Sequence, residues 1–250
     1  MSVIEKGAHR YRIFKNEHAK KFGAPIKGRL LDFGCGAGGF VIAALRDGVD
    51  VYGIEVDETR LRQCNKNSDE YEPRAKKRFT RYPGRLMPYP TNHFDACYSW
   101  FVFEHVTDPQ TSLREIVRVL RPGGTLCIHA EDVRNAWDGH AQAPWPPYLP
   151  REFAAAYLEG LGLPQHAEFV SQSVVYVSAP LVADILSTLG MEVTEFIPAQ
   201  TPKSLHEGVY VTNDAEARAL GSAVRNRAPF TSPAENMGIW ARKPLDHGKH

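Results

Sequence analysis

Short apolar runs alternate with segments of helical periodicity between residues 29 and 130. Apolar runs of this length are typical of buried strands, and the segments between them repeat apolar residues every three or four positions. The expected strands are residues 30–33, 51–56, 78–82, 94–100 and 125–130, and the expected helices are 37–46, 58–67 and 110–120. Strands and helices that alternate in this way predict a parallel sheet with helices on both faces.

The alternation stops after residue 130. The segment 131–177 is rich in tryptophan and proline, and a helical pattern occupies only its residues 151–161. Such a segment predicts an insertion that forms a lid or a pocket wall over the substrate. Residues 178–243 return to a helix and strands and are expected to complete the sheet of a single domain, 1–250.

Residues 1–28 are polar and basic, with two aromatic residues, Tyr11 and Phe14, among the charges. We expect a helix or arm here. Two interpretations are open: a helix that packs beside a ligand loop, and a solvated basic helix with two aromatic anchors.

Charge and cysteine content exclude several classes of protein. Lysine and arginine number 30 and aspartate and glutamate 29, a formal charge of +1 that argues against binding of nucleic acid or an anionic membrane. No apolar run approaches the roughly 18 residues of a membrane span, and the first residues are not of the signal-peptide type. The four cysteines, at 35, 64, 97 and 127, form no C-x-x-C pair. We therefore expect a cytoplasmic protein without disulfides or structural zinc.

The stretch LLDFGCGAGGF, residues 30–40, carries the first chemical signal. Glycines at 34, 36, 38 and 39 directly follow a strand and begin a helix. Glycine is needed where the backbone has positive φ or where a ligand lies against it, and the helix start offers unpaired N–H groups. The stretch predicts a nucleotide-like ligand at the carboxyl end of a strand.

An acidic residue stands at the end of the second strand. Glu55 follows Gly34 by 21 residues, the interval at which a βαβ unit places a carboxylate on ribose hydroxyls. The alternative is a surface acid at a strand end. Asp57 is expected to cap the following helix.

These segments together resemble the class I S-adenosylmethionine-dependent methyltransferases, of the small-molecule group called type 11 or ubiquinone/menaquinone-biosynthesis-like. The matching motifs are LLDFGCGAGGF, VYGIEVD, MPYPTNHFDACYSWFVFEHVTDP and LREIVRVLRPGGTL. The glycine loop alone also fits the dinucleotide fingerprint, so an NAD-dependent oxidoreductase is one alternative. A non-catalytic domain that binds S-adenosylmethionine is another.

The resemblance implies a Rossmann-like, doubly wound, mainly parallel seven-stranded sheet and S-adenosylmethionine as cofactor. It assigns Asp32 to the amino group of the cofactor, Glu55 to the ribose and Val56 to the adenine. The other cofactor-binding residues that it implies are Gly34, Cys35, Gly36, Gly84, Arg85 and Phe101. Relatives place an acidic residue on the adenine amino group, but PGRLMPYP, residues 83–90, has no acid. Backbone atoms of Gly84 or Arg85, or stacking, are expected to replace it.

Methyl transfer from a sulfonium gains mainly from proximity, alignment and exclusion of water, so no metal is expected. A general base is needed only where the acceptor loses a proton, and His129, His105 and His140 are the candidates. For each of them, a packing or surface role is the alternative. We expect a small-molecule acceptor, methylated on oxygen or nitrogen, while the sequence predicts no particular oligomeric state. The residues expected to bind the acceptor are Trp137, Trp145, Tyr148 and Arg151.

Overall fold

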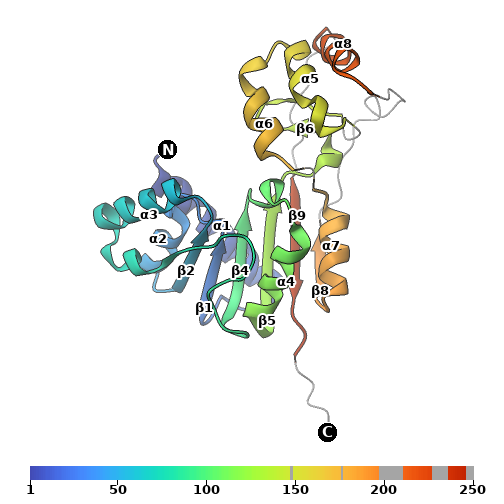
Figure 1. The fold of residues 1–250 in the computed structure, drawn as a ribbon. Coiled ribbons are helices and arrows are strands. Elements are labelled where there is room, and N and C mark those ends of the chain that lie inside the picture. Colours follow the sequence, from blue (N-terminus) through green and yellow to red (C-terminus); the bar gives the residue numbers. More distant parts are fainter. Residues whose placement is uncertain (147–148, 176, 197–210, 227–235, 246–250) are drawn as a thin grey trace.

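The computed structural model describes residues 1–146, 149–175, 177–196, 211–226 and 236–245 (Figure 1). A seven-stranded sheet in the order β3-β2-β1-β4-β5-β9-β8 forms its centre. The strands are β1 Arg29–Phe33, β2 Asp50–Glu55, β3 Phe79–Arg81, β4 Phe94–Trp100, β5 Leu120–Ala130, β8 Glu192–Phe196 and β9 Met237–Arg242. Strand β9 runs antiparallel to both of its neighbours, and the pairs from β3 to β5 are parallel. The predicted α/β architecture is confirmed.

Helices cover both faces of the sheet. Helices α1 Val3–Phe22, α2 Gly39–Arg46 and α3 Glu58–Tyr71 share one apolar core with the sheet, and α4 Pro109–Val119 and α7 Ala179–Thr188 share the other. Asp108 caps α4 through the Thr111 N–H, and Pro109 occupies the first turn, where no N–H is needed. Short 3-10 helices span Pro73–Lys77, Phe103–His105, Val133–Asn135, Arg151–Phe153 and Pro164–His166.

Helix α1 packs against the start of α2, as the first of the two interpretations expects. A capping box between Ser2 and Glu5 begins the helix. Tyr11 and Phe14 are buried against Phe40 of α2. The two helices cross so closely at Gly7 that a Cβ there would lie 2.1 Å from the carbonyl carbon of Gly39.

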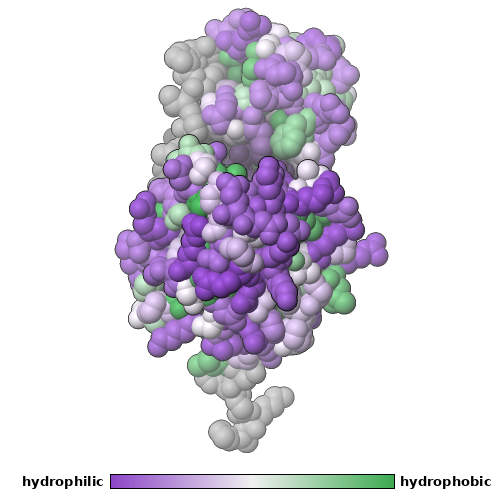
Figure 2. All heavy atoms as spheres, turned by 90° about the vertical axis from the view of Figure 1, so that its left-hand side faces the viewer, coloured by the Kyte–Doolittle hydropathy of each residue, from purple (hydrophilic) through white to green (hydrophobic). Residues whose placement is uncertain are grey.

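The segment after β5 folds into a separate unit above the carboxyl ends of the strands (Figure 1). We call this unit the lid; it comprises β6 Trp137–Asp138, β7 Ala143–Pro144, α5 Ala154–Leu161, α6 Ala167–Ser173 and α8 Asp214–Arg225, with an apolar core of its own. Figure 2 shows the lid above the sheet unit, with a recess between them and a largely hydrophilic surface below.

Two boundaries differ from the sequence expectations. Helix α8 lies within the range expected to complete the sheet, but it packs on α5, where Gly160 and Gly221 let the two helix backbones meet. Strand β5 begins at Leu120 rather than 125, because Leu120 already pairs with Phe94 of β4. Among the described residues, no helix is long and apolar enough to cross a membrane.

Candidate active site

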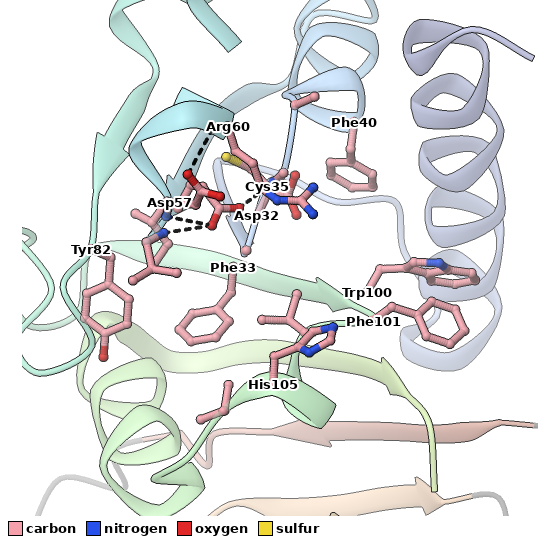
Figure 3. A pocket seen from close by; sticks show the side chains of 18 of the residues that line it. Asp32, Phe33, Cys35, Phe40, Asp57, Arg60, Tyr82, Trp100, Phe101 and His105 are labelled. Carbon is pink, nitrogen blue, oxygen red and sulfur yellow. Dashed lines mark hydrogen bonds between the residues drawn. The ribbon is translucent and has the colours of Figure 1, made fainter. Parts of the chain in front are cut away.

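A cavity of about 780 Å³ lies between the carboxyl ends of the parallel strands, α1 and the lid (Figure 3). Its walls come from the glycine loop, the end of β2, the turn after β4, one face of α1 and the end of α6. The sequence-predicted residues that line it are Asp32, Gly34, Cys35, Gly36, Glu55, Val56, Gly84, Phe101 and His105. The topology therefore brings most of the predicted cofactor residues and one predicted histidine into one space.

The glycine loop is built from backbone that other residues adopt poorly. Gly34 has φ 79° and Gly36 has φ 56°. A Cβ at Gly34 would lie 2.4 Å from Cγ2 of Val102, so the loop also needs glycine for space. The N–H groups of Gly34 and Cys35 both donate to the Ile54 carbonyl, at 3.0 and 2.9 Å. These bonds fix the loop to β2 and leave the rest of its backbone at the cavity wall.

Glu55 stands at the centre of the loop and holds it in place. Its side chain accepts backbone N–H bonds from Gly36 at 2.8 Å, Val56 at 2.9 Å and Asp57 at 3.1 Å. The residue is 8% exposed and lines the cavity. A carboxylate has about four acceptor positions, so one remains for a ligand hydroxyl beside the three in use. The surface-acid alternative does not describe this carboxylate.

Asp32 is a buried carboxylate at the carboxyl end of β1. The pKa of Asp32 is raised to about 8, mainly by burial. The positive charge of Arg10 opposes this increase, and the negative charge of Glu55 adds to it. An arriving cation, such as an ammonium group, would stabilise the ionised form. Asp32 is thus chemically suited to the amino group of an amino-acid moiety.

Beside the end of β2, Val56 is 61% exposed and lines the cavity, and so do Pro83 and Gly84. Of the two residues expected to contact the adenine, Gly84 lines the cavity and Arg85 does not. Tyr82, Asp108 and Ser112 also line the cavity, although the sequence had not pointed to them.

The other end lies beneath the lid. Trp100, Phe101 and His105 form its floor, and Phe169 and Gln172 of α6 form its roof. Phe101 has φ 54°, a strained conformation for a large residue that is fixed by its N–H bond to the His129 carbonyl at 2.7 Å. Helix α6 lies in the segment expected to form a lid or pocket wall, but the sequence pattern does not predict this helix. Its packing against the turn after β4 identifies it as the part that forms the wall.

The three candidate histidines lie in different places. His105 faces the cavity, and its Nδ1 lies 2.7 Å from the Ser173 carbonyl oxygen. His140 is outside the cavity wall, but its ring centroid is 5.0 Å from that of His105. His129 packs on Trp100 at 4.5 Å and lies outside the wall, and burial lowers its pKa to about 4.

Of the residues expected to bind the acceptor, Trp137, Trp145 and Arg151 do not line the large cavity. Trp145 is 2% exposed and packs edge-on against Tyr157 in the lid core, which is the anchoring role. Trp137 borders a small internal cavity of about 20 Å³ at the base of the lid. Arg151 donates through Nε to the Ser171 carbonyl at 2.8 Å, and Tyr148 lies outside the described residues.

Comparisons with known proteins agree with this geometry. Residues 31–128 match a family model described as a methyltransferase domain. An uncharacterized methyltransferase of Mycobacterium leprae (strain Br4923) is 34% identical over 119 residues, 47% of this chain and 43% of that protein. The 27-O-demethylrifamycin SV methyltransferase of Amycolatopsis mediterranei (strain S699) is 33% identical over 101 residues, 40% of this chain and 37% of that protein. The chain thus matches less than half the length of these curated relatives.

The fold is shared more widely than the sequence. A crystal structure described as a SAM-dependent methyltransferase from Aquifex aeolicus has a TM-score of 0.51 at 17% identity, covering 94% of this chain and 98% of that one. The family match is therefore limited to residues 31–128, and the expected fold of the sheet is confirmed. The lid, which lies beyond residue 128, is outside the family match.

Proposed function

We propose that this chain transfers the methyl group of S-adenosylmethionine to a small-molecule acceptor, on oxygen or nitrogen; residues 31–128 match a family model described as a methyltransferase domain. One observation carries the proposal. A single cavity joins the Glu55 loop, suited to a nucleoside, to an aromatic end beneath the lid, suited to an acceptor.

The residues present fit the cofactor. The Glu55 carboxylate is held with one acceptor position free for a ribose hydroxyl, and Val56 offers an exposed apolar surface to a base. Asp32 offers a buried carboxylate to the ammonium group. When bound, the sulfonium supplies an electrophilic methyl group. The chain's part is to hold that group in line with the acceptor and to exclude water.

The aromatic end would position the acceptor. Trp100 and Phe101 line the cavity from β4 and the turn after it, and Phe169 lines it from the lid, with its ring centroid 6.0 Å from that of His105. The overall exchange breaks one sulfur–carbon bond, forms one oxygen–carbon or nitrogen–carbon bond and releases one proton from the acceptor. That proton would leave at the edge of the cavity occupied by His105, whose ring faces the space (Figure 3).

The cofactor half of the proposal is tested by titration calorimetry with S-adenosylmethionine. The Glu55→Ala variant should lose about 1.5–3 kcal/mol of binding free energy, the scale of hydrogen bonds to a charged group. Glu58→Gln is a matched control, because Glu58 is an exposed acid three residues away that pairs with Arg81. Equal affinity in the Glu55→Ala and parent proteins would remove Glu55 from the ribose site.

The transfer half is tested by formation of S-adenosylhomocysteine with a panel of hydroxylated and amine acceptors. His105→Ala should lower turnover about 100-fold or more, the scale of a lost proton-transfer group, while leaving cofactor affinity unchanged. Cofactor binding without turnover on any acceptor would instead support a non-catalytic binding domain. Stabilisation by NAD in place of S-adenosylmethionine would overturn the proposal.

A further inference from the structure

A cluster of buried and half-buried titratable side chains lies where the lid meets the sheet unit. Glu104 and His105 come from the 3-10 helix after β4, and His140 from the turn between β6 and β7. One ligand atom from each of these three residues lies within 4.8 Å of the others. Glu131 and Asp138 lie on the far side of His140, with carboxylate oxygens 3.6 and 3.9 Å from its Nδ1.

The carboxylate of Glu104 is buried without a hydrogen-bond partner. It is 1% exposed, and neither carboxylate oxygen has a hydrogen-bond partner. Its side chain borders the small internal cavity together with Glu131 and Asp138. In the part of the chain that the structure describes, no lysine or arginine forms an ion pair with any of these three acids. A buried carboxylate without a hydrogen-bond donor or a basic partner is a candidate ligand for a cation.

Both histidines offer a ring nitrogen to a metal ion. Donation from Nδ1 of His105 to the Ser173 carbonyl leaves Nε2 with its lone pair, and this ring borders the large cavity. Nδ1 of His140 lies 3.6 Å from Glu131 and 3.9 Å from Asp138, beyond hydrogen-bond distance. Histidines that bind metals usually donate their other ring nitrogen to a carbonyl or carboxylate, as His105 does.

We propose that Glu104, His105 and His140 bind one divalent transition-metal ion, with zinc the best match, at the acceptor end of the cavity. Two histidines and one carboxylate are a donor set of catalytic zinc sites and leave coordination positions open. Since His105 borders the cavity, an open position faces the acceptor. The ion would bind an acceptor oxygen as a Lewis acid, so that the hydroxyl proton leaves to water before the oxygen attacks the methyl group. In this arrangement His105 acts through the ion and does not itself accept the proton, because its Nε2 binds the metal.

This inference rests on the proposed function and specifies how the acceptor is activated. It changes the sequence-based expectation that no metal takes part. The inference also gives a role to His140, which does not line the large cavity. One ion can be bound by both His140 of the lid and His105 of the cavity wall.

Metal binding is measured first, independently of activity. The full chain is stripped with chelator, titrated with Co²⁺ or Zn²⁺, and assayed by elemental analysis and by the visible absorption of bound Co²⁺. We expect one equivalent per chain, with the spectrum of a nitrogen- and oxygen-coordinated ion. Absence of stoichiometric binding, or a spectrum of hexahydrated Co²⁺, would overturn the proposal.

Variants locate the ion. Glu104→Gln and His140→Gln should each weaken Co²⁺ binding by about 100-fold or more, beyond the range seen for outer-shell residues. His129→Gln is the matched control for a half-buried histidine outside the cluster and should bind as the parent does. Thermal melts establish that each variant folds. Full metal affinity in both cluster variants would move the ion elsewhere and contradict the assignment.

The two proposals fail separately. Calorimetry with S-adenosylmethionine on the stripped protein tests the methyltransferase proposal without metal. Cofactor binding and turnover that persist without any bound metal would remove the ion and leave the methyltransferase. Metal binding without cofactor binding would leave the metal site and overturn the methyltransferase proposal.

Discussion

Asp32 shows how one residue can link cofactor binding to pH. It is surrounded by Arg10 of α1, Glu55 of β2, the neighbouring Cys35, and Cys97 and Tyr98 of β4. Its pKa of about 8 lies above the value of 3.8 for a free carboxyl group. The raised pKa stabilises the folded protein at low pH, and this contribution is lost as the pH rises toward about 8.

We predict that affinity for S-adenosylmethionine rises with pH between 6 and 8. The ammonium group favours ionised Asp32, so binding must release the proton that the free protein holds, and affinity should rise up to about tenfold per pH unit. Calorimetry in buffers of different ionisation enthalpy measures the released proton. In Asp32→Asn the release should vanish and affinity should be lower. A pH-independent affinity in the parent would show that Asp32 is ionised before the cofactor arrives.

At the residue scale, sequence reasoning succeeds where spacing along one segment determines position. Gly34 and Phe101 follow predicted strands and Glu55 lies at the end of one, so the parallel sheet brings them to one edge and into the cavity. Trp145 could not be placed in this way. Its aromatic ring suits a binding pocket and an apolar core equally, and only the packing against Tyr157 decides between them.

At the element scale, helix α1 completes the cofactor site. Its first turns place Lys6 and Arg10 on the cavity, and Gly7 sets the distance to α2. The helix itself could be expected from its sequence. Its docking could not, because a glycine that faces another glycine 32 positions later leaves no periodic pattern.

Gly7→Ala should destabilise the protein by about 1–3 kcal/mol, as overpacking does. In a free helix the same change would stabilise by up to about 1 kcal/mol, so the sign of the effect reports the contact with Gly39. Displacement of α1 should also weaken cofactor binding. Chemical denaturation and calorimetry measure the two effects. The control is Ala8→Val on the exposed side of α1, which should cost no more than about 0.7 kcal/mol. Stabilisation by Gly7→Ala would mean that α1 is not docked.

At the scale of the whole molecule, the described residues form two units that both contribute to the cavity. The sheet unit supplies the glycine loop and Glu55, and the lid supplies α6. Sequence reasoning found the insertion but not its full extent, because α8 returns to it from more than 50 residues beyond α5. Pairing of elements so distant in sequence has no local signature.

Gly221→Ala should loosen the lid and spare the sheet. A Cβ at this position would lie 2.2 Å from the Tyr157 carbonyl oxygen, so α8 cannot keep its place on α5. Hydrogen exchange should quicken in α5 and α8, and turnover should fall, while affinity for S-adenosylmethionine changes little. Ala223→Val, on the exposed side of α8, is the control. Equal losses of cofactor affinity and turnover would indicate that the two units unfold as one.

Strand β9 is the last described strand in the sequence but lies inside the sheet, so the sheet stays incomplete until this strand has been synthesised. Strand β9 lies between β5 and β8, so β8 has no neighbour and β5 keeps an open edge until residues 237–242 emerge. At bacterial or eukaryotic translation rates of about 5–20 residues per second, that wait lasts roughly 5–20 s. An unpaired strand edge is a template for association with other chains. The nascent protein is therefore most exposed to aggregation, and most dependent on chaperones, while the lid is being made.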